Sequence, residues 1–191
     1  EVEETIGFDP VGIDPIEKFV QSEVGIISLD NIDPQTTDPY LFSAIYPSVN
    51  DIPDGSSVDI PSFDLEPVTN NFSFNDFSEA VFSAGSLSLT IVNDLVIPLG
   101  DVDVKLKNSD GDEISGAATT IAGPISSGSQ ATGELDLSGV TLPGSVVVEV
   151  TGSSPGENSV FINDSTKNSS FSVEISGSSL EVSSATAKIP A

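Results

Sequence analysis

Apolar and polar residues alternate along much of the second half of the chain, as in strands with one buried face. Apolar side chains occupy every second position in four runs: Leu87, Leu89 and Ile91; Val102, Val104 and Leu106; Leu135 and Leu137; Val146, Val148 and Val150. Shorter apolar runs follow at 160–162, 171–175 and 180–189, and turn residues such as Asp110-Gly111 and Pro143-Gly144 separate the runs. Successive side chains of a strand point to opposite faces, so the pattern predicts an all-β sandwich of seven to eight short strands.

The first part of the chain has a different pattern, in which Pro repeatedly follows Asp. Proline disfavours the helical region for the residue before it, so these dipeptides predict extended chain or turns. One dipeptide differs, because Asp14 can cap a helix, Pro15 suits its first position and Glu17 completes a capping box. We therefore expect one short helix at about 15–24, a strand at 25–29, and extended chain over 31–70.

Composition also changes near residue 80. Residues 1–80 contain 17 acids, one Lys and 8 of the 13 prolines, whereas residues 81–191 contain 13 acids and four Lys. The change predicts two parts. Residues 1–80 would be an acidic, Pro- and Phe-rich region whose extended segments pack on the sandwich or on a neighbour, and residues 81–191 would be the sandwich domain.

Residues 86–106 contain a strand, an Asn-rich turn with Pro98, and a second strand. This order resembles the opening of LEA14-like and other immunoglobulin-like sandwiches, and residues 123–137 fit their pattern of a polar turn followed by a strand. The Ser, Thr, Gly and Asp content is similar to that of secreted prokaryotic surface proteins. The resemblance implies an antiparallel immunoglobulin-like sandwich that serves as a structural or binding module, and it transfers no catalytic residue.

The net charge and the missing residue types exclude several classes of function. The net charge is −25, and the chain contains no Arg, His, Cys, Met or Trp. These absences exclude a Ser-His-Asp triad, a Cys nucleophile, the usual zinc ligands and disulfides, so we expect no enzyme. A phosphate backbone would be repelled, so no nucleic acid is expected. No apolar run approaches the roughly 20 residues that a membrane-spanning helix needs.

One turn has the residue types of a calcium site. Asn108, Asp110, Asp112 and Glu113 place oxygen ligands around Gly111, and Ca²⁺ takes six to eight oxygens. An EF-hand would need Glu at position 119, which is Thr119, so that motif is absent. The alternative is a plain hairpin turn, in which Asn, Asp and Gly are expected anyway.

The strand before this turn carries charges of both signs on one face. Asp101 and Asp103 share that face with Lys105 and Lys107, because residues two apart in a strand point the same way. A mixed-charge surface facing solvent is therefore expected there, rather than a second acidic site.

Aromatic residues gather in the first part of the chain. Phe72, Phe74 and Phe77 predict a strand with one aromatic face, which we expect to pack into the core because Phe is usually buried. The alternative is a binding or assembly surface, to which Tyr40 and Tyr46 would contribute. An extended N-terminal arm could also complete the sheet of a neighbour, since strand edges accept other strands.

Two functional hypotheses follow. The first is a non-enzymatic extracellular or cell-envelope structural protein, a building block of a filament, a layer or a larger envelope protein that associates with itself or with other surface proteins and is stabilised by ions. The second is a calcium-assisted adhesion module that binds glycan or protein and needs exposed aromatic rings. The chain begins at Glu1 without Met, so we expect a removed leader or a segment of a longer protein.

Overall fold

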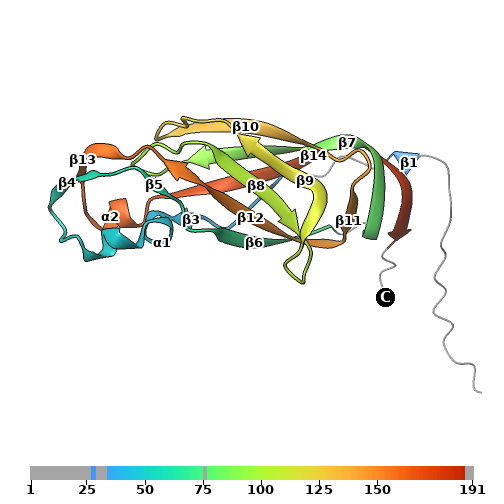
Figure 1. Cartoon of the computed structure of the whole chain (residues 1–191), viewed down its shortest axis with the longest axis horizontal. Coiled ribbons are helices and arrows are strands. Elements are labelled where there is room, and N and C mark those ends of the chain that lie inside the picture. Colours follow the sequence, from blue (N-terminus) through green and yellow to red (C-terminus); the bar gives the residue numbers. More distant parts are fainter. Residues whose placement is uncertain (1–26, 29–33, 75–76, 188–191) are drawn as a thin grey trace, which may run out of the picture.

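The computed structural model describes residues 27–28, 34–74 and 77–187, and it is built of antiparallel strands in two packed sheets and one small two-stranded sheet (Figure 1). The predicted all-β class is therefore confirmed. The predicted helix at 15–24 lies outside the described residues, as does most of the predicted strand at 25–29, of which Ile27–Ser28 forms a strand.

The first sheet is organised around two long neighbouring strands, β7 and β14. Its seven strands are β1 (Ile27–Ser28), β2 (Gln35–Thr36), β3 (Tyr40–Leu41), β7 (Phe77–Asn93), β10 (Ser129–Asp136), β11 (Thr141–Pro143) and β14 (Ser170–Ala187). Strands β10 and β11 pair with the edge of β7 that faces away from β14. Strands β1, β2 and β3 pair with the opposite, outer edge of β14.

The second sheet has β12 at its centre. Its five strands are β5 (Phe63–Asp64), β6 (Val68–Ser73), β8 (Val102–Lys107), β9 (Glu113–Ile121) and β12 (Ser145–Ser154). Strand β12 pairs with β8 on one side and with β5 and β6 on the other, and β8 continues to β9 through a hairpin. Strands from before residue 80 thus join both sheets.

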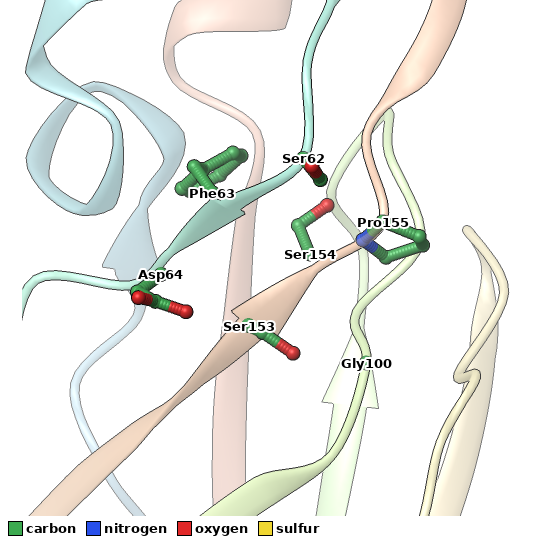
Figure 2. Close-up of a pocket in the computed structure, with 7 residues that line it drawn as sticks. All are labelled: Ser62, Phe63, Asp64, Gly100, Ser153, Ser154 and Pro155. Atoms are coloured by element: carbon green, nitrogen blue, oxygen red, sulfur yellow. The ribbon is translucent and has the colours of Figure 1, made fainter.

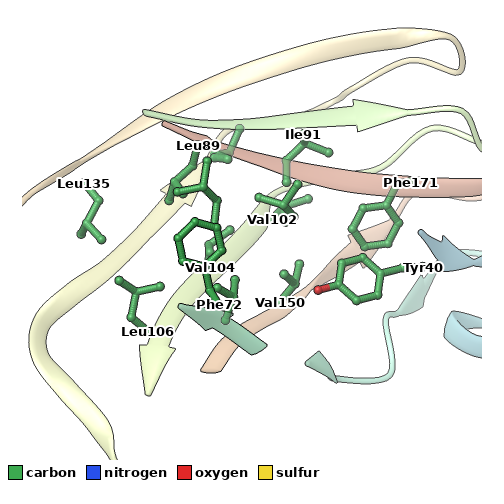
Figure 3. Close-up of a cluster of buried hydrophobic side chains, with 14 of the residues drawn as sticks. Tyr40, Phe72, Leu89, Ile91, Val102, Val104, Leu106, Leu135, Val150 and Phe171 are labelled. Carbon is green, nitrogen blue, oxygen red and sulfur yellow. The ribbon is translucent and has the colours of Figure 1, made fainter. Parts of the chain in front are cut away.

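The core lies between the two sheets and follows the alternation seen in the sequence (Figure 3). The inward residues of β7, β8 and β12 are all at most 2% exposed: Leu87, Leu89, Ile91, Val102, Val104, Leu106, Val146, Val148 and Val150. Their polar neighbours in the same strands are half-buried or exposed. The predicted strands at these positions are confirmed, and each contributes one apolar face to the sandwich.

One end of the molecule is closed by short elements (Figure 1). They are α1 (Phe42–Ile45), η1 (Pro47–Asp51), β4 (Ser57–Ile60), β13 (Glu157–Phe161) and α2 (Asp164–Lys167). The prediction of extended chain over 31–70 is wrong for α1 and η1. Phe42, Ile45 and Val49 are buried at helical spacing, so helical turns place all three against the core.

Strands β7 and β14 are longer than the short strands that were predicted. The runs at 171–175 and 180–189 were predicted as two strands, and the structure joins residues 170–187 into one strand with shifts of register after Ser178. Gly85 lies opposite this irregularity with φ +115°, and a Cβ there would lie 2.9 Å from the Leu180 Cα. A glycine accepts this backbone conformation and close approach, so the strand pair continues through the bend.

A buried amide organises the loop that follows β7. The Asn93 side chain is 0% exposed, and its Nδ2 donates to the carbonyl oxygens of Ile97 at 3.1 Å and Ile125 at 2.9 Å. Its Oδ1 accepts a hydrogen bond from the backbone N–H of Leu95 at 3.1 Å. One side chain therefore satisfies three backbone groups where the chain leaves the sheet.

Asn93→Ala should lower the free energy of unfolding by about 2–4 kcal/mol, because it leaves the Ile97 carbonyl and the Leu95 N–H buried without their partner and removes one of the two hydrogen bonds to the Ile125 carbonyl. The measurement is urea unfolding followed by circular dichroism. Asn158→Ala is the control, since Asn158 is an exposed residue of β13, and it should change stability by no more than about 0.5 kcal/mol. Equal effects of the two substitutions would contradict the role given to Asn93.

Candidate functional site

Three short strands from the N-terminal region cover the outer edge of β14, and together they are called the cover strands. Strand β1 lies opposite Glu181 and Val182, β2 opposite Glu174 and Ile175, and β3 opposite 170–171. All three run antiparallel to β14 and have two residues each, whereas β14 has 18. No described residue pairs with this edge between 176 and 180. Within the described part of the chain, the edge is therefore covered in pieces.

Thr37 continues the pairing with β14 beyond β2, through its backbone N–H and its side chain. Its backbone N–H donates to the Val173 carbonyl at 2.9 Å, and its Oγ1 accepts from the Val173 N–H at 3.1 Å. Asp38 and Pro39, both exposed, then follow before the ladder resumes at Tyr40. The hydroxyl thus supplies the acceptor that a regular strand would supply from its backbone.

Tyr40 anchors the last cover strand in the core (Figure 3). Its ring is 7% exposed and lies 5.0 Å from the ring of Phe171, centroid to centroid. Its Oη is buried and has no hydrogen-bond partner within the described part of the chain. Burial raises the pKa of the Tyr40 hydroxyl, the Thr37 side chain offsets part of that shift, and the charge of Asp38 adds to it.

Burial along the cover strands is uneven. Tyr40 is buried and Leu41 is 36% exposed, but Ser28 and Thr36 are exposed and Gln35 is half-buried. Backbone hydrogen bonds therefore account for most of the attachment of β2 to β14, whereas apolar packing also stabilises β3.

The covered edge is acidic. Thr36 lies opposite Glu174, and Ser28 lies opposite Glu181. The three described lysines form ion pairs elsewhere: Lys105 with Glu113, Lys107 with Glu149, and Lys167 with Asp54. A second acidic chain approaching this edge would be repelled at low ionic strength.

The aromatic residues that were candidates for binding pack inside the molecule. Phe72, Phe74 and Phe77 are at most 7% exposed and contact one another in sequence, with ring centroids 5.3 and 5.0 Å apart. Tyr46 is half-buried, and its ring centroid lies 4.5 Å from that of Phe63. The prediction that these phenylalanines pack into the core is confirmed. The adhesion hypothesis thereby loses the exposed rings on which it depended.

The predicted calcium turn joins β8 to β9 as a hairpin turn. Asn108 Oδ1 accepts hydrogen bonds from the backbone N–H groups of Asp110 at 3.0 Å and Asp112 at 2.9 Å. Glu113 pairs with Lys105 at 3.3 Å, and the carboxylates of Asp110 and Asp112 are exposed. No group of three or more acidic side chains placed to hold a metal occurs among residues 27–28, 34–74 and 77–187. Calcium binding at this turn stays a prediction.

The mixed-charge face predicted on β8 is confirmed. Lys105 and Lys107 form ion pairs with acids of the neighbouring strands, β9 and β12. Asp101 Oδ1 accepts a hydrogen bond from the Gly123 backbone N–H at 2.9 Å. On the solvent face of the second sheet, both lysines are thus paired with carboxylates, and Asp101 is paired with a backbone amide.

A shallow hollow of about 430 Å³ lies where β5 meets the end of β12 (Figure 2). Its lining residues are Ser62, Phe63, Asp64, Gly100, Ser153, Ser154 and Pro155. Ser154 Oγ donates to the Pro98 carbonyl at 2.7 Å and accepts from the Gly156 N–H at 3.1 Å, so it serves the local backbone. The lining offers hydroxyls and one carboxylate, and the chain has no His to activate a serine.

Comparison with known proteins identifies no relative. No protein-family model and no curated protein matches the chain. Part of an arabinose-bound α-L-arabinofuranosidase is similar at 12% identity and TM-score 0.33, over 83% of this chain and 23% of the other. The VP2 subviral particle of infectious bursal disease virus is similar at 12% identity and TM-score 0.26, over 92% and 44%. The chain thus spans less than half of either structure, and similarity at these scores supports no statement about function.

The described residues include no helix that is both long enough and apolar enough to cross a membrane.

Tyr40→Phe should raise the free energy of unfolding by about 1 kcal/mol, because it removes a buried hydroxyl without a partner. It should also reduce the fall in the free energy of unfolding at alkaline pH. The folded pKa of Tyr40 is raised above its usual 10.0, so the folded state keeps a proton that the unfolded state loses, and stability falls as pH rises above about 10. Urea unfolding between pH 8 and 11 measures both effects. Tyr46→Phe is the control, and it should retain the alkaline loss of stability that is assigned to Tyr40. An unchanged alkaline loss in Tyr40→Phe would contradict that assignment.

The calcium prediction has its own test. If the turn at 108–113 binds Ca²⁺, millimolar calcium should raise the melting temperature and give heat in calorimetric titration, because a ligand of the folded state stabilises it. The double variant Asp110→Asn, Asp112→Asn should lose both effects. Binding is contradicted if the natural chain shows neither heat nor a temperature shift.

Proposed function

We propose that this chain is a non-enzymatic structural protein, a β-sandwich building block of a filament, a layer or a larger protein of the cell exterior or envelope. The observation that carries the proposal is the outer edge of β14, which the described residues before β4 cover with the two-residue strands β1, β2 and β3. Strand edges with free backbone groups pair readily with strands of other chains. An edge covered in pieces is therefore a natural contact between copies.

The faces of the sandwich support a structural role. On the first sheet, Ser88 lies opposite Ser176 and Thr90 opposite Thr132, whose hydroxyls are 2.8 Å apart. The second sheet presents the ion pairs of Lys105 and Lys107. Both outer faces are thus hydrophilic at these positions. Most of the described rings lie in or against the core, and Phe161 of β13 is 53% exposed. Contacts between copies are then expected at strand edges, where the backbone can bind.

The charge supports an exterior location. At −25, repulsion within and between copies is strong unless salt or cations screen it. A saline or calcium-rich exterior supplies that screening, and we extend the proposal to extracellular localisation and ion-stabilised assembly. The immunoglobulin-like relationship belongs to the same proposal, and it is supported by the antiparallel pairing of the two sheets.

Light scattering coupled to size-exclusion chromatography should show assembly of the natural chain that increases with sodium chloride or calcium concentration, because screening reduces repulsion. A variant lacking residues 1–30 loses β1 and should assemble less. A natural chain that stays monomeric under all these conditions would contradict the proposal.

A matched pair of substitutions locates the contact. Glu174→Gln removes one charge at the covered edge and should allow assembly at lower salt than the natural chain needs. Glu157→Gln removes the same charge from β13, away from this edge, and should leave the salt requirement unchanged. Equal shifts would indicate an effect of net charge alone.

A further inference from the structure

The cover strands contain an irregularity between β2 and β3. Thr36 lies opposite Glu174 and Tyr40 opposite Phe171, so the N-terminal segment takes four steps where β14 takes three. The extra length falls at Asp38 and Pro39, which are both exposed. Proline has no N–H to contribute to a ladder. Because Pro39 donates no hydrogen bond to the ladder, the backbone can change direction at Asp38-Pro39 without breaking one.

The two sides of this irregularity differ in how firmly they are attached. On the C-terminal side, Tyr40 and Phe42 are 7% and 0% exposed, and the Phe42 N–H donates to the Ser169 carbonyl at 2.8 Å. On the N-terminal side, Thr36 is exposed and Gln35 is half-buried. Thr37 is buried, but its two hydrogen bonds go to one backbone residue, Val173. Detaching β2 and Thr37 thus breaks a few backbone bonds and uncovers little apolar surface.

The backbone groups of β14 with which β2 and Thr37 pair are present on every copy of the chain. They join backbone groups and one hydroxyl to the backbone of β14, so an identical segment of a second copy can make all of them. Pairing within one chain is favoured in dilute solution, because the two partners are tethered. Pairing between chains gains as the protein concentration rises, and exchange of identical elements needs no new interface.

We propose that copies of this chain assemble by strand exchange: β2 and Thr37 of one copy pair with the outer edge of β14 of a second copy, and Asp38-Pro39 is the hinge. This inference rests on the proposed function and names its contact. Tyr40 keeps its place beside Phe171 of its own chain. Repeated head to tail, the contact builds an open filament.

Engineered cysteines in the full-length chain test the exchange directly, because the natural chain has none. Thr36 and Glu174 are ladder partners with exposed side chains, so Thr36→Cys and Glu174→Cys can form a disulfide across the contact. The two single variants carry different tags, are mixed at the salt concentration that gives assembly, and are oxidised. Exchange predicts disulfide-linked heterodimers, which mass spectrometry identifies by the linked peptides.

The control is a pair that cannot exchange through this hinge. Thr90 and Thr132 are partners on β7 and β10, with hydroxyls 2.8 Å apart. A mixture of Thr90→Cys and Thr132→Cys should give only background heterodimer, several-fold less than the first mixture. The double variant Thr36→Cys, Glu174→Cys should form its disulfide within one chain in dilute solution, which verifies that the substituted chain folds in this register.

Two results would overturn the exchange. If the chain assembles but the Thr36→Cys and Glu174→Cys mixture gives no more heterodimer than the control, strand exchange is wrong while the building-block function stands. If light scattering shows no assembly at all, the proposed function fails, and the exchange fails with it.

Discussion

The pairing of β7 with β14 is the interaction on which the rest of the molecule depends. These strands have 17 and 18 residues and run antiparallel from Asn93 opposite Phe171 to Phe77 opposite Ala187. Their inward residues, including Leu89 and Ile175, form one wall of the core. The other strands of the first sheet attach to one of the two free edges of this pair. The bend at Gly85 lets β7 and β14 stay paired on both sides of it.

The two free edges of this pair are covered very differently. Strand β10 pairs with β7 over eight residues and contributes Leu135 to the core. The outer edge of β14 receives the cover strands, of two residues each. Backbone pairing is worth little per bond unless side chains are buried with it, so the β14 edge is the weaker of the two. This asymmetry makes the β14 edge the place where another copy can compete.

The sequence predicted the strands with regular alternation, because Leu87, Val104 and Val148 each begin or continue a run of buried positions spaced by two. It also predicted the hairpin turn at Asn108–Asp112, where turn chemistry is local. The strands β2, β3 and β5 were not predicted, since two residues cannot display a period. The joining of 171–175 to 180–187 was missed because Gly177 and the serines after it are also typical of a turn.

The candidate site was predicted only in outline. An N-terminal arm that completes the sheet of a neighbour was one alternative, but the sequence does not identify β14 as its partner, since that pairing joins residues more than 100 positions apart. The role of Tyr40 as a buried anchor was missed because a tyrosine suits a core and a binding surface equally well. The roles of Thr37 and Asn93 depend on which backbone groups the fold leaves unpaired, and no local pattern reports this.

Copies of the chain are proposed to meet at the outer edge of β14. Electron cryomicroscopy of the native assembled material shows which chain supplies the strands on that edge, and so it tests this contact directly. Strand exchange places β2 of one copy beside Glu174 and Ile175 of the next, with the chain crossing between copies at Asp38-Pro39. Copies that meet through another surface, each with its own β2 on its own β14, would contradict it.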